Sequence, residues 1–223
     1  RQEQIDAVVE AVREGLIAVA DPARAPGQQA YMKSAMPFLG VRVPDARRVA
    51  TTAIRGLSDG EVLLGITATL WDQATHREHR YAALAVLAAR PLRGDDRLVP
   101  LIEHVVRTGR WWDFTDEVAH RVSQLHDADP ATTAHLVREW STDDDFWMRR
   151  LAIISQLGRR GRTDRDLLAE LIEPNLAGSE FFIRKAIGWA LRAYAYTDPD
   201  WVRAFATTRS LSALSRREAM KHL

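Results

Sequence analysis

Four side chains that could take part in catalysis or binding recur in register along this chain: Trp112, Asp116, Arg150 and Trp189. A carboxylate beside polarizable indole faces is suited to stabilise positive charge, and a guanidinium offers a fixed charge with a fork of N–H donors. If positions 115, 150 and 185, which are 35 residues apart, are taken as equivalent, each side chain has an offset from the nearest of them. Trp112 falls at −3, Asp116 at +1, Trp189 at +4 and Arg150 at 0. The first three offsets form one stripe on a helix, and offset 0 borders it. The spacing therefore predicts that the four side chains converge on one side of three consecutive repeats.

Each of the four residues also has a purely structural interpretation. A tryptophan at helical spacing usually belongs to the core, and a single aspartate is usually a solvated charge. Arg150 could cap a neighbouring helix or pair with Asp144 or Asp145. Taken together the four favour a functional site, because a structural face has no need for paired indoles around opposite charges.

The register comes from an internal repeat. Arg80, Arg150 and Lys185 each lie in a basic group followed by an apolar run, and they are separated by 70 and 35 residues. A 35-residue period with two helices per unit indicates stacked helical pairs. The tetratricopeptide Trp/Leu/Gly/Tyr pattern is absent, so HEAT-like pairs are favoured. We expect an all-α fold, a superhelical array of antiparallel HEAT-like helical pairs, forming a single domain over residues 1–223.

Local patterns agree with an all-helical chain. Apolar residues recur at helical spacing and no strand pattern is found, which predicts eleven or twelve helices. Ser58 with Glu61 fits a capping box at the start of one helix. Pro130 and Pro199 fit the first turn of two others, where proline is tolerated.

Composition excludes several kinds of chemistry. The chain has no cysteine, so disulfides, thiolate metal sites and cysteine nucleophiles are ruled out. His76 and His79 are three residues apart and could chelate a metal, but a surface pair is the preferred interpretation. We therefore predict no metal and no cofactor. No apolar run approaches the roughly 18 residues that span a bilayer, so we predict no membrane partner.

Several segments resemble the AlkD family of DNA alkylation repair glycosylases. Residues 111–116 are similar to its Trp-Trp-Asp-x-x-Asp segment, and residues 146–153 to its Trp-x-x-Arg-x-Ala-Ile segment. Residues 181–189 resemble its Phe-Ile-x-Lys-Ala-Ile-Gly-Trp helix. The family's opening motif is matched at residues 31–33 and 37–41. The resemblance covers roughly residues 28–203, and four ordered motifs at the family's spacing make it specific.

This resemblance implies a role for each of the four residues. Trp112 and Trp189 would flank the deoxyribose of a damaged nucleotide. Asp116 would stabilise the sugar cation and position the attacking water, and Arg150 would hold the neighbouring backbone phosphate.

It also implies residues that bind DNA outside this set. Tyr31 and Arg42 would approach the DNA near the lesion. Some members have glutamine at the position of Arg42, so base contacts or substrate range would differ here. We also assign DNA binding to Lys33, which lies in the opening motif, and to Arg149 and Lys185, which lie in the segments that match the family.

The implied activity is that of a monofunctional alkylpurine DNA glycosylase acting in base excision repair. Its partner would be duplex DNA containing cationic N3- or N7-alkylated purines, and we expect a monomer in a bacterial cytoplasm. Two alternatives remain open: a catalytically silent DNA-binding relative, and a helical-repeat scaffold for protein interaction. The preferred lesion, methyl or bulky, stays open, as does the choice between general repair and antibiotic self-resistance.

Overall fold

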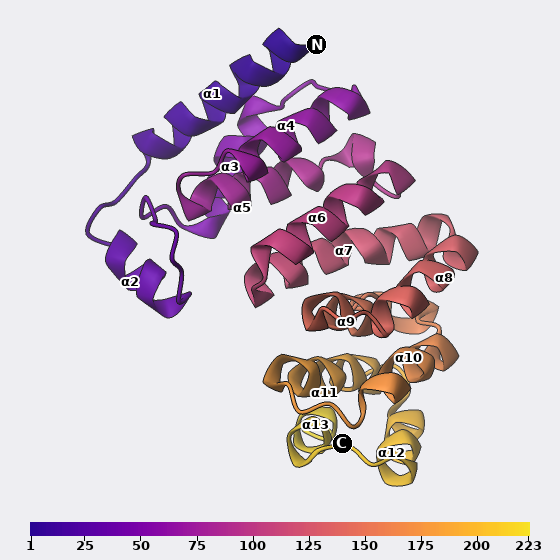
Figure 1. Cartoon of the computed structure of the whole chain (residues 1–223). Coiled ribbons are helices and arrows are strands. Elements are labelled where there is room, and N and C mark those ends of the chain that lie inside the picture. The colour runs from indigo at the N-terminus through magenta and orange to yellow at the C-terminus, as the bar shows by residue number, and fades with distance from the viewer. The chain divides into compact units, whose positions relative to one another are not determined.

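The computed structural model describes all 223 residues and contains thirteen α-helices, four short 3₁₀ helices and no strand (Figure 1). The predicted all-α fold class is confirmed. The chain divides into two compact units, unit 1 from Arg1 to Arg93 and unit 2 from Gly94 to Leu223.

Unit 1 is built around α5, which packs against both α3 and α4, while α1 packs on α3 and α4. Its core contains fully buried aliphatic side chains such as Leu16, Leu63 and Ile66, which recur at helical spacing. Its helices are α1 (Gln2–Ala18), α2 (Ala25–Tyr31), α3 (Val43–Ala53), α4 (Gly60–Asp72), α5 (Arg77–Leu87) and the 3₁₀ helix η1 (Arg90–Leu92).

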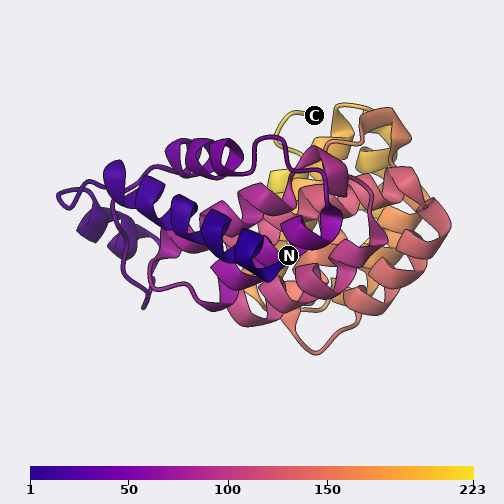
Figure 2. The same cartoon turned by 90° about the horizontal axis from the view of Figure 1, so that it is seen from above.

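Unit 2 is a stack in which α7, α9 and α11 pack in a row, each on the next. The helix α6 packs on α7, α8 and α10 pack on α9, and α13 covers α11. Seen from above in Figure 2, the magenta to orange helices of this unit lie one behind another. Its α-helices are α6 (Val99–Gly109), α7 (Trp112–Ala128), α8 (Pro130–Ser141), α9 (Phe146–Ile153), α10 (Arg165–Ile172), α11 (Phe181–Ala195), α12 (Pro199–Thr208) and α13 (Ala213–Ala219). Its 3₁₀ helices are η2 (Asp96–Leu98), η3 (Arg160–Arg162) and η4 (Glu173–Asn175).

The repeat inferred from the sequence is visible in the helix boundaries. The helices α5, α7, α9 and α11 begin at Arg77, Trp112, Phe146 and Phe181, so successive starts are 35, 34 and 35 residues apart. Within unit 2 the row of α7, α9 and α11 thus brings equivalent sequence positions to neighbouring helices.

Aspartates cap many of these helices. The predicted capping box at Ser58 was wrong, because Asp59 is the cap of α4 and its carboxylate accepts from the N–H groups of Glu61 and Val62. Aspartate competes well here because a charged acceptor also meets the positive end of the helix dipole. The same arrangement begins α8, where Pro130 occupies the first turn, and α12, where Pro199 does.

Candidate active site

Asp116 and Arg150 form a two-point ion pair between α7 and α9. Nε of Arg150 donates to one carboxylate oxygen at 2.9 Å and Nη2 donates to the other at 3.0 Å. Because the row of helices repeats every 34 to 35 residues, residues 34 apart face each other across one helix contact. The alternative partners of Arg150, Asp144 and Asp145, are not used.

Burial makes this pair unusual among the ion pairs of the chain. The side chain of Arg150 is 6% exposed and that of Asp116 is 19% exposed. Nη1 of Arg150 donates to the backbone carbonyl of Phe182 on α11 at 2.7 Å. The guanidinium carbon lies 5.8 Å from the ring centroids of both Phe182 and Trp189. Hydrogen bonds and aromatic faces therefore compensate the buried cation, as a buried charge requires.

Burial also controls the charge on Asp116. Loss of water around the carboxyl raises its pKa above the usual range, and the hydrogen bonds and charge of Arg150 oppose that rise. Asp113 adds to the rise and His120 reduces it. The carboxylate is thus a desolvated anion held by one cation. Its attraction for a second positive charge nearby is strong because little water surrounds it to screen that charge.

The two candidate tryptophans are half-buried, in contrast with the core tryptophans Trp71, Trp140 and Trp147. Trp112 begins α7, one turn before Asp116. Trp189 lies on α11 beside the guanidinium of Arg150 and also lines a cavity of about 600 Å³. The structure therefore brings Asp116, Arg150 and Trp189 together and leaves part of both indoles exposed.

An aromatic cluster supports this site, and the sequence analysis missed it. The rings of Trp111, Trp147 and Phe182 contact one another, with centroids 4.8 to 6.0 Å apart. The signal was present, because aromatic pairs occur at residues 111–112, 146–147 and 181–182, at 35-residue intervals. Packing of these rings fixes the carbonyl of Phe182 that accepts from Arg150.

The other two candidate residues of unit 2 are engaged in contacts of their own. Arg149 donates to Asn175 at 3.2 Å and to Glu180 at 2.9 Å. Lys185 lies 3.5 Å from a carboxylate oxygen of Glu218 and its side chain is 39% exposed. A DNA phosphate would therefore have to compete with Glu180 for Arg149 and with Glu218 for Lys185.

The three candidate residues of unit 1 are exposed and have no side-chain hydrogen bond or ion pair. Tyr31 is 77% exposed at the end of α2, and Arg42 precedes α3 with its side chain in solvent. Lys33 is also exposed, and its backbone is left-handed at a φ of 50°. All three are free to contact a ligand.

A buried carboxylate organises the segment before Arg42, which sequence reasoning also missed. Glu78 on α5 is fully buried and accepts from the backbone N–H groups of Leu39, Gly40 and Val41 at 2.9 to 3.1 Å. Gly40 has a φ of 89°, and an added Cβ would lie 1.8 Å from the carbonyl oxygen of Asp21. The glycine of this motif is therefore required by the backbone.

No three His, Asp or Glu side chains lie close enough together to hold a metal ion. His76 and His79 contact each other edge to face, with ring centroids 5.6 Å apart. No helix is long and apolar enough to cross a membrane.

Comparison with known proteins identifies a matching family and solved structures of similar fold. The model of a family described as DNA alkylation repair enzyme matches residues 12–223. A solved structure described as a predicted DNA alkylation repair enzyme from Enterococcus faecalis is 29% identical, with a TM-score of 0.83, over 92% of this chain and 96% of that one. The crystal structure of smu.31 from Streptococcus mutans UA159 shares the fold at 16% identity and a TM-score of 0.64, over 81% of this chain and 92% of that one. No curated protein matches the chain.

Proposed function

Since the chain belongs to the family of DNA alkylation repair enzymes, we propose that it is a monofunctional DNA glycosylase, which hydrolyses the N-glycosidic bond of N3- or N7-alkylated purines in duplex DNA. It would work as a monomer without a cofactor, and the freed base would start base excision repair.

The chemistry of such lesions fits the residues present. A purine alkylated at N3 or N7 carries a positive charge, so it takes the electron pair of the glycosidic bond and leaves as a neutral base. No general acid is needed for that departure. The positive charge passes to the sugar, and a water molecule then adds to the sugar carbon and loses a proton. The enzyme's task is to stabilise an oxocarbenium-like sugar.

The observation that carries the proposal is the desolvated carboxylate of Asp116, held in place by Arg150 beside the indole of Trp189. A preorganised anion next to a sugar gains attraction only as the bond breaks, and this lowers the barrier rather than the ground state. Indole faces add a second favourable interaction with a cation. We assign Asp116, Trp112 and Trp189 to the sugar cation, with Asp116 also orienting the water.

Arg150 would act in two ways. Three of its five N–H groups donate to Asp116 and Phe182, so it fixes the position of the carboxylate. The two remaining N–H groups, on Nη1 and Nη2, can bind a backbone phosphate of the lesion nucleotide. This second role is the one that the family resemblance implies.

The exposed residues of unit 1 support contact with DNA outside the site. Tyr31, Lys33 and Arg42 have no internal partner, and a tyrosine with two cations suits a sugar–phosphate backbone. In unit 2, Arg149 and Lys185 would add positive charge near Arg150.

The test is base release from duplexes that carry 7-methylguanine, 3-methyladenine or a bulky N3 adduct, with freed bases identified by mass spectrometry. We expect wild-type protein to release at least one of these bases and Asp116→Asn to release it far more slowly. Asp166→Asn, which removes an exposed carboxylate on α10, is the charge-matched control. Binding to abasic-analogue DNA without base release would instead identify a silent DNA-binding relative, and no DNA binding would favour a protein scaffold.

A further inference from the structure

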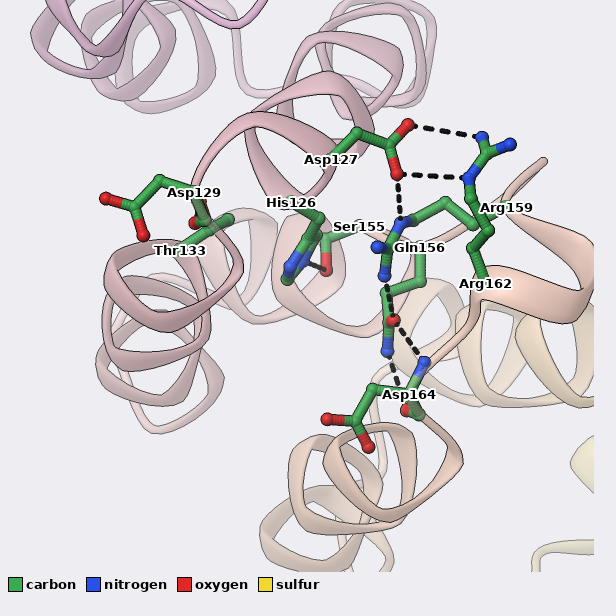
Figure 3. Close-up of polar contacts among 9 residues, drawn as sticks. All are labelled: His126, Asp127, Asp129, Thr133, Ser155, Gln156, Arg159, Arg162 and Asp164. Carbon is green, nitrogen blue, oxygen red and sulfur yellow. Dashed lines mark hydrogen bonds and ion pairs between the residues drawn. The ribbon is translucent and has the colours of Figure 1, made fainter.

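The loop that follows α9 contains three arginines among glycines, and one of these arginines is buried. Arg159 points inward, where its Nε donates to Asp127 at 3.1 Å and its Nη1 donates to Gln156 at 2.7 Å (Figure 3). Arg162 joins the same carboxylate from the surface, with bonds of 3.2 and 3.1 Å. The two guanidiniums therefore share one carboxylate.

Gln156 connects this loop to the start of α10. Its side-chain oxygen accepts from the backbone N–H of Asp164 at 2.8 Å, and its side-chain nitrogen donates to the carbonyl of Asp164 at 2.9 Å (Figure 3). Both ends of the loop are thus fixed by hydrogen bonds that do not involve Arg160. The loop is a rigid platform rather than a free segment.

The side chain of Arg160 has no evident role in that platform, although its carbonyl accepts from the backbone N–H of Thr163 at 3.0 Å. Its side chain is exposed and makes no hydrogen bond or ion pair. Its backbone is left-handed, with a φ of 51°. This conformation costs roughly 1–2 kcal/mol for a residue with a Cβ and nothing for glycine, which flanks it at positions 158 and 161. An arginine at a position that favours glycine points to a function of its side chain.

Arg160 faces a hollow that Trp189 of the candidate site also lines. The hollow has a volume of about 600 Å³, and its lining includes two arginines and no carboxylate. The second arginine, Arg192, is paired with Glu218 at 2.8 Å, a carboxylate that Lys185 also contacts. Arg160 is therefore the cation of this hollow that has no carboxylate partner, and the exposed ring of Tyr196 also lines the hollow.

We propose that this hollow is a second phosphate subsite, in which Arg160 binds a backbone phosphate of the DNA strand whose damaged nucleotide lies at Trp189. The inference rests on the proposed function. Trp189 adjoins Arg150 in the site and shares the hollow with Arg160. A strand carries a phosphate at every nucleotide, so a sugar placed at Trp189 presents successive phosphates to these two cations. A guanidinium on a rigid loop binds such an anion through charge-assisted hydrogen bonds without the further cost of ordering the loop backbone.

Arg160→Gly tests this directly, because glycine removes the guanidinium and is compatible with the left-handed backbone. The measurement is binding to intact and abasic-analogue duplexes over a range of salt concentrations. We expect weaker binding to both, with a log–log salt slope less steep by about 0.9, the value of one phosphate contact. Arg160→Lys should restore most of the slope. Arg203→Ala, which removes an exposed arginine of α12 that is paired with Asp200, should leave the slope unchanged.

Base release by the same proteins separates this inference from the proposed function. With lesion duplex and limiting enzyme, we expect Arg160→Gly to release bases more slowly than wild type, because it binds the duplex more weakly. If wild-type protein releases bases and Arg160→Gly keeps the wild-type salt slope, the subsite is refuted and the glycosylase assignment stands. If wild-type protein neither binds DNA nor releases bases, both are refuted.

Discussion

Asp116 on α7 and Arg150 on α9 meet through two parallel hydrogen bonds of 2.9 and 3.0 Å, while the guanidinium is almost fully removed from solvent. Such a pair is costly to desolvate, and removal of either partner leaves the other uncompensated. The half-exposed indole of Trp189 lies beside the guanidinium, with its ring centroid 5.8 Å from the guanidinium carbon.

The first prediction concerns the charge of Asp116. Asp116→Asn retains the size of the side chain, so duplex affinity should be unchanged or slightly higher as repulsion from phosphate falls. Excision of 7-methylguanine should slow by about 10²-fold or more, the effect of losing one electrostatic stabiliser. Single-turnover base release and parallel binding measure the two effects, and a melting curve checks the fold. Wild-type excision by a folded Asp116→Asn protein would remove this residue from the mechanism.

The second prediction concerns pH. If Asp116 stabilises the sugar cation, it does so only when ionised, so excision should fall as pH drops through its pKa, which burial raises above the usual range. Arg150 opposes that rise, so Arg150→Ala should move the acid limb of the profile to higher pH. The measurement is single-turnover excision at several pH values, corrected for spontaneous depurination. An acid limb at the same pH in both proteins would show that the limb does not report Asp116.

The 35-residue register predicted the row of helices and the approach of Asp116 to Arg150, because a repeat places equivalent positions on neighbouring helices. It did not predict that Arg150 would be buried, because that burial involves contacts with the rings of Phe182 and Trp189 on α11, and Phe182 in turn packs on Trp111 and Trp147. The rings of residues 111, 147 and 182 belong to aromatic pairs that recur every 35 residues, so a search for adjacent aromatic residues at that interval would find them in the sequence.

The support beneath the opening motif was beyond sequence reasoning for a different reason. Glu78 accepts from backbone groups 37 to 39 residues away, and backbone donors leave no trace in side-chain types. The glycine at position 40 was the one local feature of the sequence that indicated an unusual backbone conformation in residues 39–41. Similarly, Asp59 rather than Ser58 is the cap because α4 begins one residue later than the capping box at Ser58 would require.

The third prediction tests whether Arg150 contacts phosphate as well as Asp116. If it does, Arg150→Ala should bind lesion-free duplex more weakly, with a salt slope reduced by about 0.9. Asp116→Asn, which disturbs the pair but keeps the arginine, should retain the slope. Unchanged affinity and slope in Arg150→Ala would leave Arg150 with a positioning role alone.

The fourth prediction concerns the segment before Arg42. Glu78→Gln replaces an anion that accepts from three N–H groups with an amide that has one acceptor oxygen. Loss of charge-assisted bonds at a fully buried site should cost about 2–3 kcal/mol of unfolding free energy. Urea unfolding measures this cost. The control is Glu61→Gln, which changes an exposed glutamate of α4 in the same unit and should have a much smaller effect. Equal stability of the two variants would contradict a structural role for Glu78.

The last prediction follows from His126 on α7, which is buried and hydrogen bonded to the hydroxyl of Ser155 at 3.1 Å (Figure 3). Burial, assisted by the nearby positive charge of Arg159, lowers its pKa from 6.5 to about 4. Between these two values the unfolded chain binds a proton that the folded protein does not. The unfolding free energy therefore decreases as pH falls from about 6.5 towards 4. Above pH 6.5 the histidine is neutral in both states and causes no loss of unfolding free energy.

For one such histidine the loss between pH 7 and pH 5 is about 2 kcal/mol. His79 in unit 1, whose pKa burial also lowers to about 4, should contribute a similar loss. We therefore expect His126→Gln to lose less unfolding free energy than wild type over this range, although its stability at pH 7 is lower. Urea unfolding at pH 7, 6 and 5 gives the three values, with the exposed His135→Gln as the control. A wild-type pH dependence in His126→Gln would show that this histidine is protonated equally in the folded and unfolded states.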